Sequence, residues 1–385
     1  MIDEEELKER IIQSFREQGF KYNPHVRPPQ NDKETYKQLQ IYSKMEQMQL
    51  HRSFLLENLK KVRKYAKSGK DINPSEIKLE LKLVKEGSLE EVLFRWWNFV
   101  WWSVPYQRGY GRMLRFILWD TTHNAPFGLI SLQSPILKIS VRDKYLGLPP
   151  KELDIWVNQS MQAQRLGALP PYNDLLGGKM VALAITCNEL RELYQEKYKN
   201  TKTVLKDREI ENRLLFLTTT SAFGKSSIYN RLKYNDEIVA QSLGYTQGSG
   251  SFHISEKLYL EILAFLDQKG FNTARGYGNG PSRKMRLIDK GLNLLGLKNA
   301  VYHNIKREFY LFPLAENLQS VISQTEEPIY YNRPFQDVFD YWLQRYCIPR
   351  AERNQSWLKF EADDYFENII TTYQLQKDGK LEPTV

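Results

Sequence analysis

Two short runs of apolar residues, 113–119 and 127–132, are separated by the polar segment 120–126. Runs of this length on either side of a polar turn predict a β-hairpin. Beyond the hairpin the pattern alternates, and it favours a strand within 155–169, a helix over 180–198 and a strand over 214–220. Strands interleaved with helices predict a mixed α/β core from about 110 to 255.

Predicted helices flank this core on both sides. Apolar residues recur near a 3.6-residue period within 5–16, 32–67 and 256–268. We therefore expect an α+β fold. Its three parts are a helical N-terminal arm within 1–90, the mixed α/β core within 91–255 and a basic α+β C-terminal region within 256–385.

Charge restricts the class of partner. The 385 residues include 55 Lys and Arg against 46 Asp and Glu, which gives a formal net charge of +9. Segment 270–310 alone holds eight basic and two acidic residues, a net charge of +6. Positive charge gathered in one segment favours an anionic partner, and we expect DNA. Aromatic residues make up 13% of the chain, too many for a disordered protein.

Several kinds of site and location are disfavoured. The two cysteines, Cys187 and Cys347, are too few for a disulfide framework or a cysteine zinc site. Histidines and carboxylates show no metal-ligand spacing, so we predict no metal site. No run approaches the roughly 18 apolar residues of a membrane helix, and residues 1–6 are acidic where a secretory signal needs positive charge. We expect a soluble, cytoplasmic protein that contacts no membrane.

The first candidate anion-binding segment is 218–226. A predicted strand leads into Gly224, Lys225 and Ser226 and then into a short helix, which is the context of a P-loop. A P-loop needs a glycine five residues before its second glycine, and Thr219 occupies that position. The alternative is a polar turn that caps a helix.

The second candidate is Gly177, Gly178 and Lys179, at the start of the helix after the 155–169 strand. Free backbone amides at a helix start favour an anion. The order of hairpin, strand, loop, helix and strand is similar to that of the GCN-related acyltransferase fold. This resemblance implies that loop 173–179 holds a coenzyme pyrophosphate, although the Gly-x-Gly or Gly-x-Ala pattern of that family's loop is absent here.

Basic residues of the C-terminal region are candidate nucleic-acid contacts. They are Arg275, Arg283, Lys284, Arg286, His303, Lys306 and Arg307. We expect the trio at 283, 284 and 286 to project into solvent with poor pairing, and the alternative is pairing with the acidic residues 4–6. The trio at 303, 306 and 307 would share one face of a helix and bind phosphate there, whereas at a strand edge it would not.

Two further segments each allow two interpretations. The basic residues within 60–70 are either a solvated helix end or a patch that contacts phosphate. The tryptophans within 96–102 are interpreted as core between the parts of the chain, with a base-stacking platform as the alternative.

Several blocks in order along the chain resemble one family. They include RDKYLG at 142–147, LGALPPYNDLLGGK at 166–179, TTTSAFGKSSIYNRL at 218–232 and GYTQGSGSFH at 244–253. These blocks, with others between about 90 and 355, are similar to the DruA family. At 280–283 this chain has Gly-Pro-Ser-Arg where the family pattern runs Gly-Pro-Asn-Trp, so any stacking by that tryptophan is lost here.

The resemblance implies a component of the Druantia anti-phage defence system of bacteria. It also implies action alongside other Druantia proteins, including a large helicase-like subunit. It transfers no catalytic residue and no cofactor, which both stay unknown. We expect binding to double-stranded DNA with little sequence preference, or to a DNA-bound defence complex. The alternative is an enzyme that acts on nucleic acid, either a nuclease or an acyl-type transferase on the GCN-related scaffold.

Overall fold

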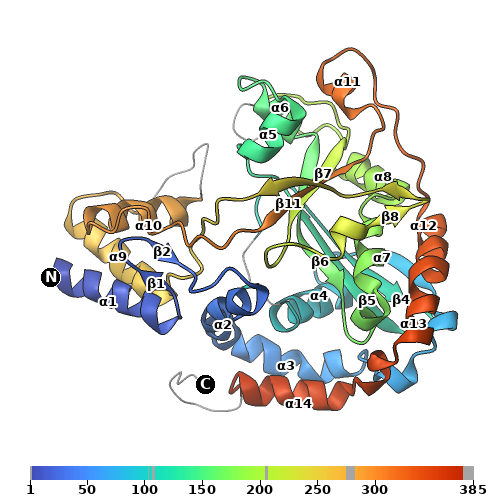
Figure 1. Cartoon of the computed structure of the whole chain (residues 1–385), viewed down its shortest axis with the longest axis horizontal. Helices are drawn as coiled ribbons and strands as arrows, with labels where there is room; N and C mark the ends of the chain where they lie inside the picture. Colours follow the sequence, from blue (N-terminus) through green and yellow to red (C-terminus); the bar gives the residue numbers. More distant parts are fainter. Residues whose placement is uncertain (1, 103, 106–108, 204–206, 275–281, 376–385) are drawn as a thin grey trace.

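The computed structural model describes residues 2–102, 104–105, 109–203, 207–274 and 282–375, and its centre is a seven-stranded sheet (Figure 1). The strand order is β10-β11-β7-β6-β5-β4-β3, and all neighbours are antiparallel except β6 and β7, which are parallel. The strands are β3 (Leu79–Leu83), β4 (Met113–Asp120), β5 (Ala125–Gln133), β6 (Ser160–Ala168), β7 (Phe216–Thr220), β10 (Gln241–Tyr245) and β11 (Glu308–Pro313). The predicted hairpin is confirmed as β4 and β5.

Helices cover both faces of this sheet, which is therefore the middle layer of three. One face carries α7 (Gly177–Ala184), α8 (Asn188–Lys197) and α12 (Phe335–Trp342), and the other carries α3 (Arg52–Arg63), α4 (Leu89–Val100) and α14 (Ala362–Thr372). The central strands are buried on both sides, so their apolar residues run continuously rather than in strict alternation.

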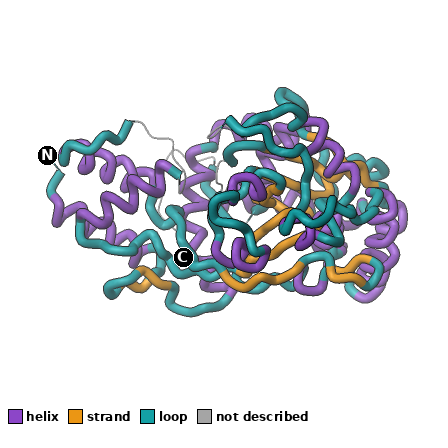
Figure 2. The backbone as a smooth tube through the Cα atoms, turned by 90° about the horizontal axis from the view of Figure 1, so that it is seen from above, coloured by secondary structure: helices purple, strands orange, loops and turns teal. Residues whose placement is uncertain are grey.

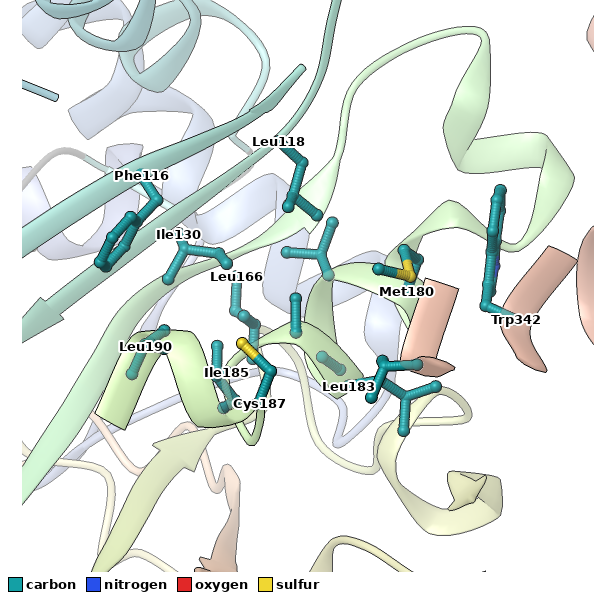
Figure 3. Close-up of a cluster of buried hydrophobic side chains, with 14 of the residues drawn as sticks. Phe116, Leu118, Ile130, Leu166, Met180, Leu183, Ile185, Cys187, Leu190 and Trp342 are labelled. Carbon is teal, nitrogen blue, oxygen red and sulfur yellow. The ribbon is translucent and has the colours of Figure 1, made fainter. Parts of the chain in front are cut away.

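Successive residues of β4 point to opposite layers, as the two-residue period of a strand requires. Phe116 packs in the cluster that includes Met180 of α7, and Ile117 packs in the cluster that includes Trp97 of α4. Figure 3 shows Phe116 and Ile130 facing the layer of Met180 and Leu183. Trp96 and Trp97 are each 1% exposed, which confirms their interpretation as core.

A smaller unit projects from one end of the molecule (Figure 2). We call it the lobe, and it consists of the described residues of 4–31 and 248–305; the remainder is the body. Its elements are α1 (Glu4–Glu17), β1 (Lys21–Tyr22), β2 (Val26–Arg27), α9 (Glu256–Gln268) and α10 (Arg283–Leu294). A separate apolar cluster holds the lobe together, and α2 (Lys33–Leu50) connects it to the body.

The remaining elements lie around the body. They are α5 (Ser140–Leu146), α6 (Leu153–Val157), α11 (Leu318–Ile322), α13 (Ile348–Arg353), β8 (Lys233–Tyr234) and β9 (Glu237–Ile238). A π-helix over 343–347 joins α12 to α13.

Three predicted elements differ from the structure. The helix predicted over 32–67 is two helices, α2 and α3, which meet at His51 with φ −109°. The helix predicted over 180–198 is α7 and α8, separated where the Thr186 hydroxyl donates to the Leu183 carbonyl and competes with the helical pattern. The strand predicted within 155–169 begins at 160, because 153–157 form α6.

Packing does not follow the predicted boundaries at 90/91 and 255/256. The sheet takes β3 from the first predicted part and β11 from the third. The lobe joins α1 of the first part to α9 of the third. Within the described ranges, the helices lack the combined length and apolar character that a membrane span requires.

Candidate nucleic-acid interface

A basic cleft of about 380 Å³ lies on the lobe, where the chain leaves it to enter β11. Lys21 of β1, Arg27 of β2 and Lys306, just before β11, all line it. The other lining residues are Pro28, Pro29, Asn31 and Asn304. The three cations are exposed. In the part of the chain that the structure describes, none of the three forms an ion pair, and the described lining includes no Asp or Glu.

Short contacts fix the two sides of the cleft. Asn304 Nδ2 donates to the carbonyl of Val26 at 2.7 Å, which ties the loop before β11 to β2. The Tyr36 hydroxyl donates to Asn31 Oδ1 at 3.1 Å, and it lies close enough to the Lys306 backbone amide for that amide to oppose the rise in pKa that burial causes. The cations are therefore carried on a hydrogen-bonded frame that spans separate segments of the chain.

The loop 221–226 lies against the same end of β11. The Glu308 amide donates to the Gly224 carbonyl at 3.0 Å, and the Ser221 amide donates to the Glu308 carbonyl at 2.9 Å. Gly224 also forms a β-bridge with Arg307. The structure thus brings Lys225 and Ser226 next to the segment of Lys306, although the sequence presented them as separate candidates.

The amides of this loop are used within the protein. Ser226 N donates to the Tyr310 hydroxyl at 3.1 Å, and Ser221 N is bonded to β11. A P-loop turns such amides toward phosphate. Ser221 and Ser226 therefore fit the alternative of a polar turn rather than a P-loop, and Lys225 between them is exposed.

A buried carboxylate holds the loop in place. Glu308 is 5% exposed and accepts from Ser242 Oγ at 2.6 Å and from Asn230 Nδ2 at 3.0 Å. It also accepts from the Tyr310 hydroxyl. Burial opposes ionisation, but these hydrogen bonds, with Lys225 nearby, outweigh it and hold the pKa of Glu308 below its ordinary value. Glu308 therefore remains an anion that anchors the loop to β11.

Arg307 and His303 face inward. The Arg307 guanidinium donates to Gln40 Oε1 at 3.2 Å, its Nε has no hydrogen-bond partner, and burial lowers its pKa to about 10. Arg307 is therefore still a cation at neutral pH. His303 is 3% exposed, and its Nδ1 accepts from the Ile305 amide at 3.1 Å. The residues 303–307 form no helix, so the predicted shared helical face is absent from this described segment, and Lys306 alone of the trio is exposed.

The trio at 283, 284 and 286 begins α10 in the lobe. Lys284 Nζ lies 2.6 Å from Glu256 Oε2 and 4.6 Å from the ring centre of Tyr259. The expectation of poor pairing is therefore wrong for Lys284, and its partner comes from α9 rather than from residues 4–6. Glu4 pairs instead with Lys269. Arg275 lies outside the described residues.

The start of α7 is enclosed by protein atoms. Gly177 and Gly178 are buried, and a Cβ on Gly177 would lie 2.6 Å from the Tyr172 carbonyl oxygen. Lys179 Nζ donates to the Arg231 carbonyl at 2.6 Å, and burial lowers its pKa to about 8. This triplet is thus part of the core between α7 and its neighbours. It does not converge with the basic cleft.

Some of the basic residues within 60–70 form ion pairs, and others are exposed to solvent. Arg63 forms an ion pair with Glu367 at 2.6 Å, and Lys70 forms one with Glu361 at 3.1 Å. Both pairs hold this basic segment against α14 and the residue before it. Within the described ranges, no group of three or more His, Cys, Asp or Glu side chains is placed to hold a metal ion.

Sequence reasoning missed Lys21 and Arg27. Each lies in a strand of two residues, where no period can be read. The register pairs Lys21 with Arg27 across the ladder, which sets the two cations side by side. The sequence does place these two cations on either side of a short segment that contains Pro24. A segment of this kind predicts a β-hairpin only weakly.

Comparisons with known proteins agree with the sequence blocks noted above. The family described as "Druantia protein DruA" matches residues 30–324. A Druantia protein DruA from Escherichia coli (strain UMEA 4076-1) is 32% identical over 375 residues, which cover 96% of this chain and 93% of that protein. No solved structure matches, so the likeness to the GCN-related acyltransferase fold stays a prediction. With this match over most of its length, the chain belongs to the DruA family of Druantia anti-phage defence proteins.

Proposed function

We propose that this protein serves anti-phage defence by binding DNA in the cleft of Lys21, Arg27 and Lys306. The observation that carries the proposal is the convergence of these exposed, unpaired cations from separate segments onto one concave site within the described residues. Like charges held together repel, and exposed charges contribute about 0–1 kcal/mol to stability even when paired. DNA phosphates would neutralise them and release counterions, which favours binding.

The surroundings of the cleft support an anionic ligand. Arg307, the partly buried neighbour of Lys306, has no carboxylate partner among the described residues and adds positive potential near the cleft. The hydrogen bonds of Asn304 and Tyr36 hold the frame before any ligand arrives, so less conformational freedom is lost on binding.

Contacts of this kind position DNA without reading its sequence. Lysine and arginine side chains that meet phosphate carry no base information, so we expect little sequence preference. In this proposal the DNA-bound protein acts with other Druantia proteins, including a helicase-like subunit, in the bacterial cytoplasm.

The test is the variant Lys21→Gln/Arg27→Gln/Lys306→Gln. We expect it to reduce the slope of log affinity against log salt by up to about 2.7 for duplex and about 2.1 for single-stranded DNA, since each lost phosphate contact removes about 0.9 or about 0.7. Affinity for labelled single-stranded and duplex DNA would be measured by fluorescence anisotropy between about 50 and 200 mM salt, the range over which such contacts dominate. Because all three side chains are exposed, the melting temperature should hardly change.

The matched control is Lys85→Gln/Lys151→Gln/Lys199→Gln. It removes the same charge from exposed lysines outside the cleft that have no ion pair among the described residues. We expect its salt slope to equal that of the unmodified protein. Equal slopes for all three proteins, or equal losses in the two variants, would show that the cleft is not the DNA site.

A further inference from the structure

The size of the cleft limits the form of nucleic acid that can enter it. A volume of about 380 Å³ is that of a pocket for a small molecule, and one nucleotide is a ligand of this size. A DNA duplex is too wide to enter and would contact these exposed cations from outside. An unpaired strand can place its backbone inside.

Two exposed tyrosines lie on segments next to those that carry the cations. Tyr245, the last residue of β10, is 48% exposed and pairs with Glu308 in the β10–β11 ladder. The next residue, Thr246, donates its amide to the Arg307 carbonyl at 2.9 Å, so the chain at Tyr245 runs beside the segment of Lys306. Tyr302 is 38% exposed, and its carbonyl accepts from Asn304, which lines the cleft.

Tyr245 also lies near Tyr36 of α2, the helix that connects the lobe to the body. Burial raises the pKa of Tyr36, and the ionised form of Tyr245 is close enough to raise it further. Tyr36 itself donates to Asn31 of the lining and lies near the Lys306 backbone amide. The exposed ring is thus a neighbour of the frame that carries the cations.

Exposed aromatic rings beside unpaired cations suit one form of ligand. In a duplex each base is already stacked on its neighbours, and its faces are closed to a side chain. In an unpaired strand the faces are open, and stacking on an aromatic side chain contributes about 1–3 kcal/mol per base. Cations that follow the backbone, with rings for the bases, form the usual platform for single strands.

We infer that the cleft prefers an unpaired DNA strand to a duplex. Lys21, Arg27 and Lys306 hold its phosphates, and Tyr245 and Tyr302 stack its bases. This inference rests on the proposed function and names the form of DNA that the same site takes.

The test compares Tyr245→Ala with the matched variant Tyr245→Phe, which keeps the ring. Affinity is measured for a single strand and for the duplex of the same sequence. We expect the unmodified protein to bind the single strand more tightly. Tyr245→Ala should weaken single-strand binding about 5- to 150-fold, which corresponds to one stacked base, and Tyr245→Phe should bind as the unmodified protein does. The salt slope should not change in either variant, because a ring contact releases no counterions.

Other outcomes separate this inference from the proposed function. If duplex is bound as tightly as single strand, or Tyr245→Ala weakens both equally or neither, the preference for unpaired DNA is wrong. The proposed function then still stands, provided that the triple glutamine variant reduces the salt slope. If that variant leaves the slope unchanged, the cleft is not the DNA site and both conclusions fall. The melting temperature of each variant shows that it is folded, and exposure of Tyr245 makes this the expected result.

Discussion

At the scale of single residues, two buried histidines link stability to pH. His253 is 0% exposed; its Nε2 donates to the Ala300 carbonyl at 2.8 Å, and its Nδ1 has no hydrogen-bond partner. Burial lowers its pKa to about 4. Burial, with His253 and Arg307 nearby, also holds the pKa of His303 well below its ordinary value. Both rings are therefore neutral in the folded lobe at pH 7.

The sign of the pH effect follows from these lowered pKa values. Unfolded histidine has a pKa of about 6.5, so the stabilisation is fully present above that pH and is lost as pH falls toward 4. We expect the free energy of unfolding to decrease by about 2 kcal/mol between about pH 7 and pH 5 from His253 alone. Urea unfolding at the two pH values measures it. His253→Gln should lose less stability over this interval, whereas His25→Gln, at an exposed position, should match the unmodified protein. Equal losses in all three would contradict the assignment.

Only part of the candidate site could be predicted from single residues of the sequence. Lys306 was predicted because it lies in a segment of high net charge, and that property needs no fold. Lys21 and Arg27 were missed because their role depends on a contact with residues almost 280 positions later, through Asn304 and Val26. Arg307 was expected to face a phosphate, but it turns toward Gln40 because neighbouring residues of an extended segment point to opposite sides.

At the scale of elements, the start of α7 gives a sharp comparison of two glycines. In Gly177→Ala the new Cβ would lie 2.6 Å from the Tyr172 carbonyl and 2.7 Å from Ala168 Cβ. We expect this overpacking to lower the free energy of unfolding by about 1–3 kcal/mol. In Gly178→Ala the Cβ would lie 2.8 Å from Ile228 Cδ1, the end of a flexible side chain that can move. We therefore expect the free energy of unfolding to fall by less than about 1 kcal/mol, because the better helix propensity of alanine offsets part of the loss.

Urea unfolding of both variants at one pH measures this difference. A larger loss in Gly178→Ala than in Gly177→Ala would contradict the packing of α7 described above. Retention of DNA binding in a folded Gly178→Ala protein is also expected, because α7 is not part of the cleft.

Elements with a strong local pattern were predictable and interrupted ones were not. The β4–β5 hairpin was found because its turn is polar and both strands are apolar. The break between α2 and α3 was missed because the apolar pattern continues across His51. Only tertiary packing separates them, since α2 packs partly in the lobe and α3 packs in the body.

At the scale of the whole molecule, the lobe and the body are joined by several crossings of the chain. The segment after 305 leads directly into β11, and Phe223 of the body loop packs in the lobe cluster. We therefore expect one unfolding transition rather than two. Phe15→Ala removes a ring that is 0% exposed and contacts Tyr22 and His253, and it should cost about 3–5 kcal/mol.

Calorimetry of Phe15→Ala checks this expectation, since a single transition should move to lower temperature as a whole. The control Leu260→Ala changes an apolar residue of the same lobe that is 58% exposed, and its stability should stay within about 0.5 kcal/mol. A separate early transition in Phe15→Ala would show that the lobe unfolds independently of the body.

The pairing of α1 with α9 also sets an order of events during synthesis. The apolar face of α1 leaves the ribosome about 240 residues before its partner helix. At about 5–20 residues per second this is a delay of roughly 12–50 s, during which Leu7, Ile11 and Phe15 can pack only against nearby residues such as Tyr22 and not against α9. The lobe thus contains a helix that is synthesised early, but its core can be completed only late in synthesis. A nascent chain that stops before Asn304 has two of the three cations of the cleft and lacks Asn304 and Lys306 of its lining, so truncated chains are expected to bind DNA poorly and to require chaperones.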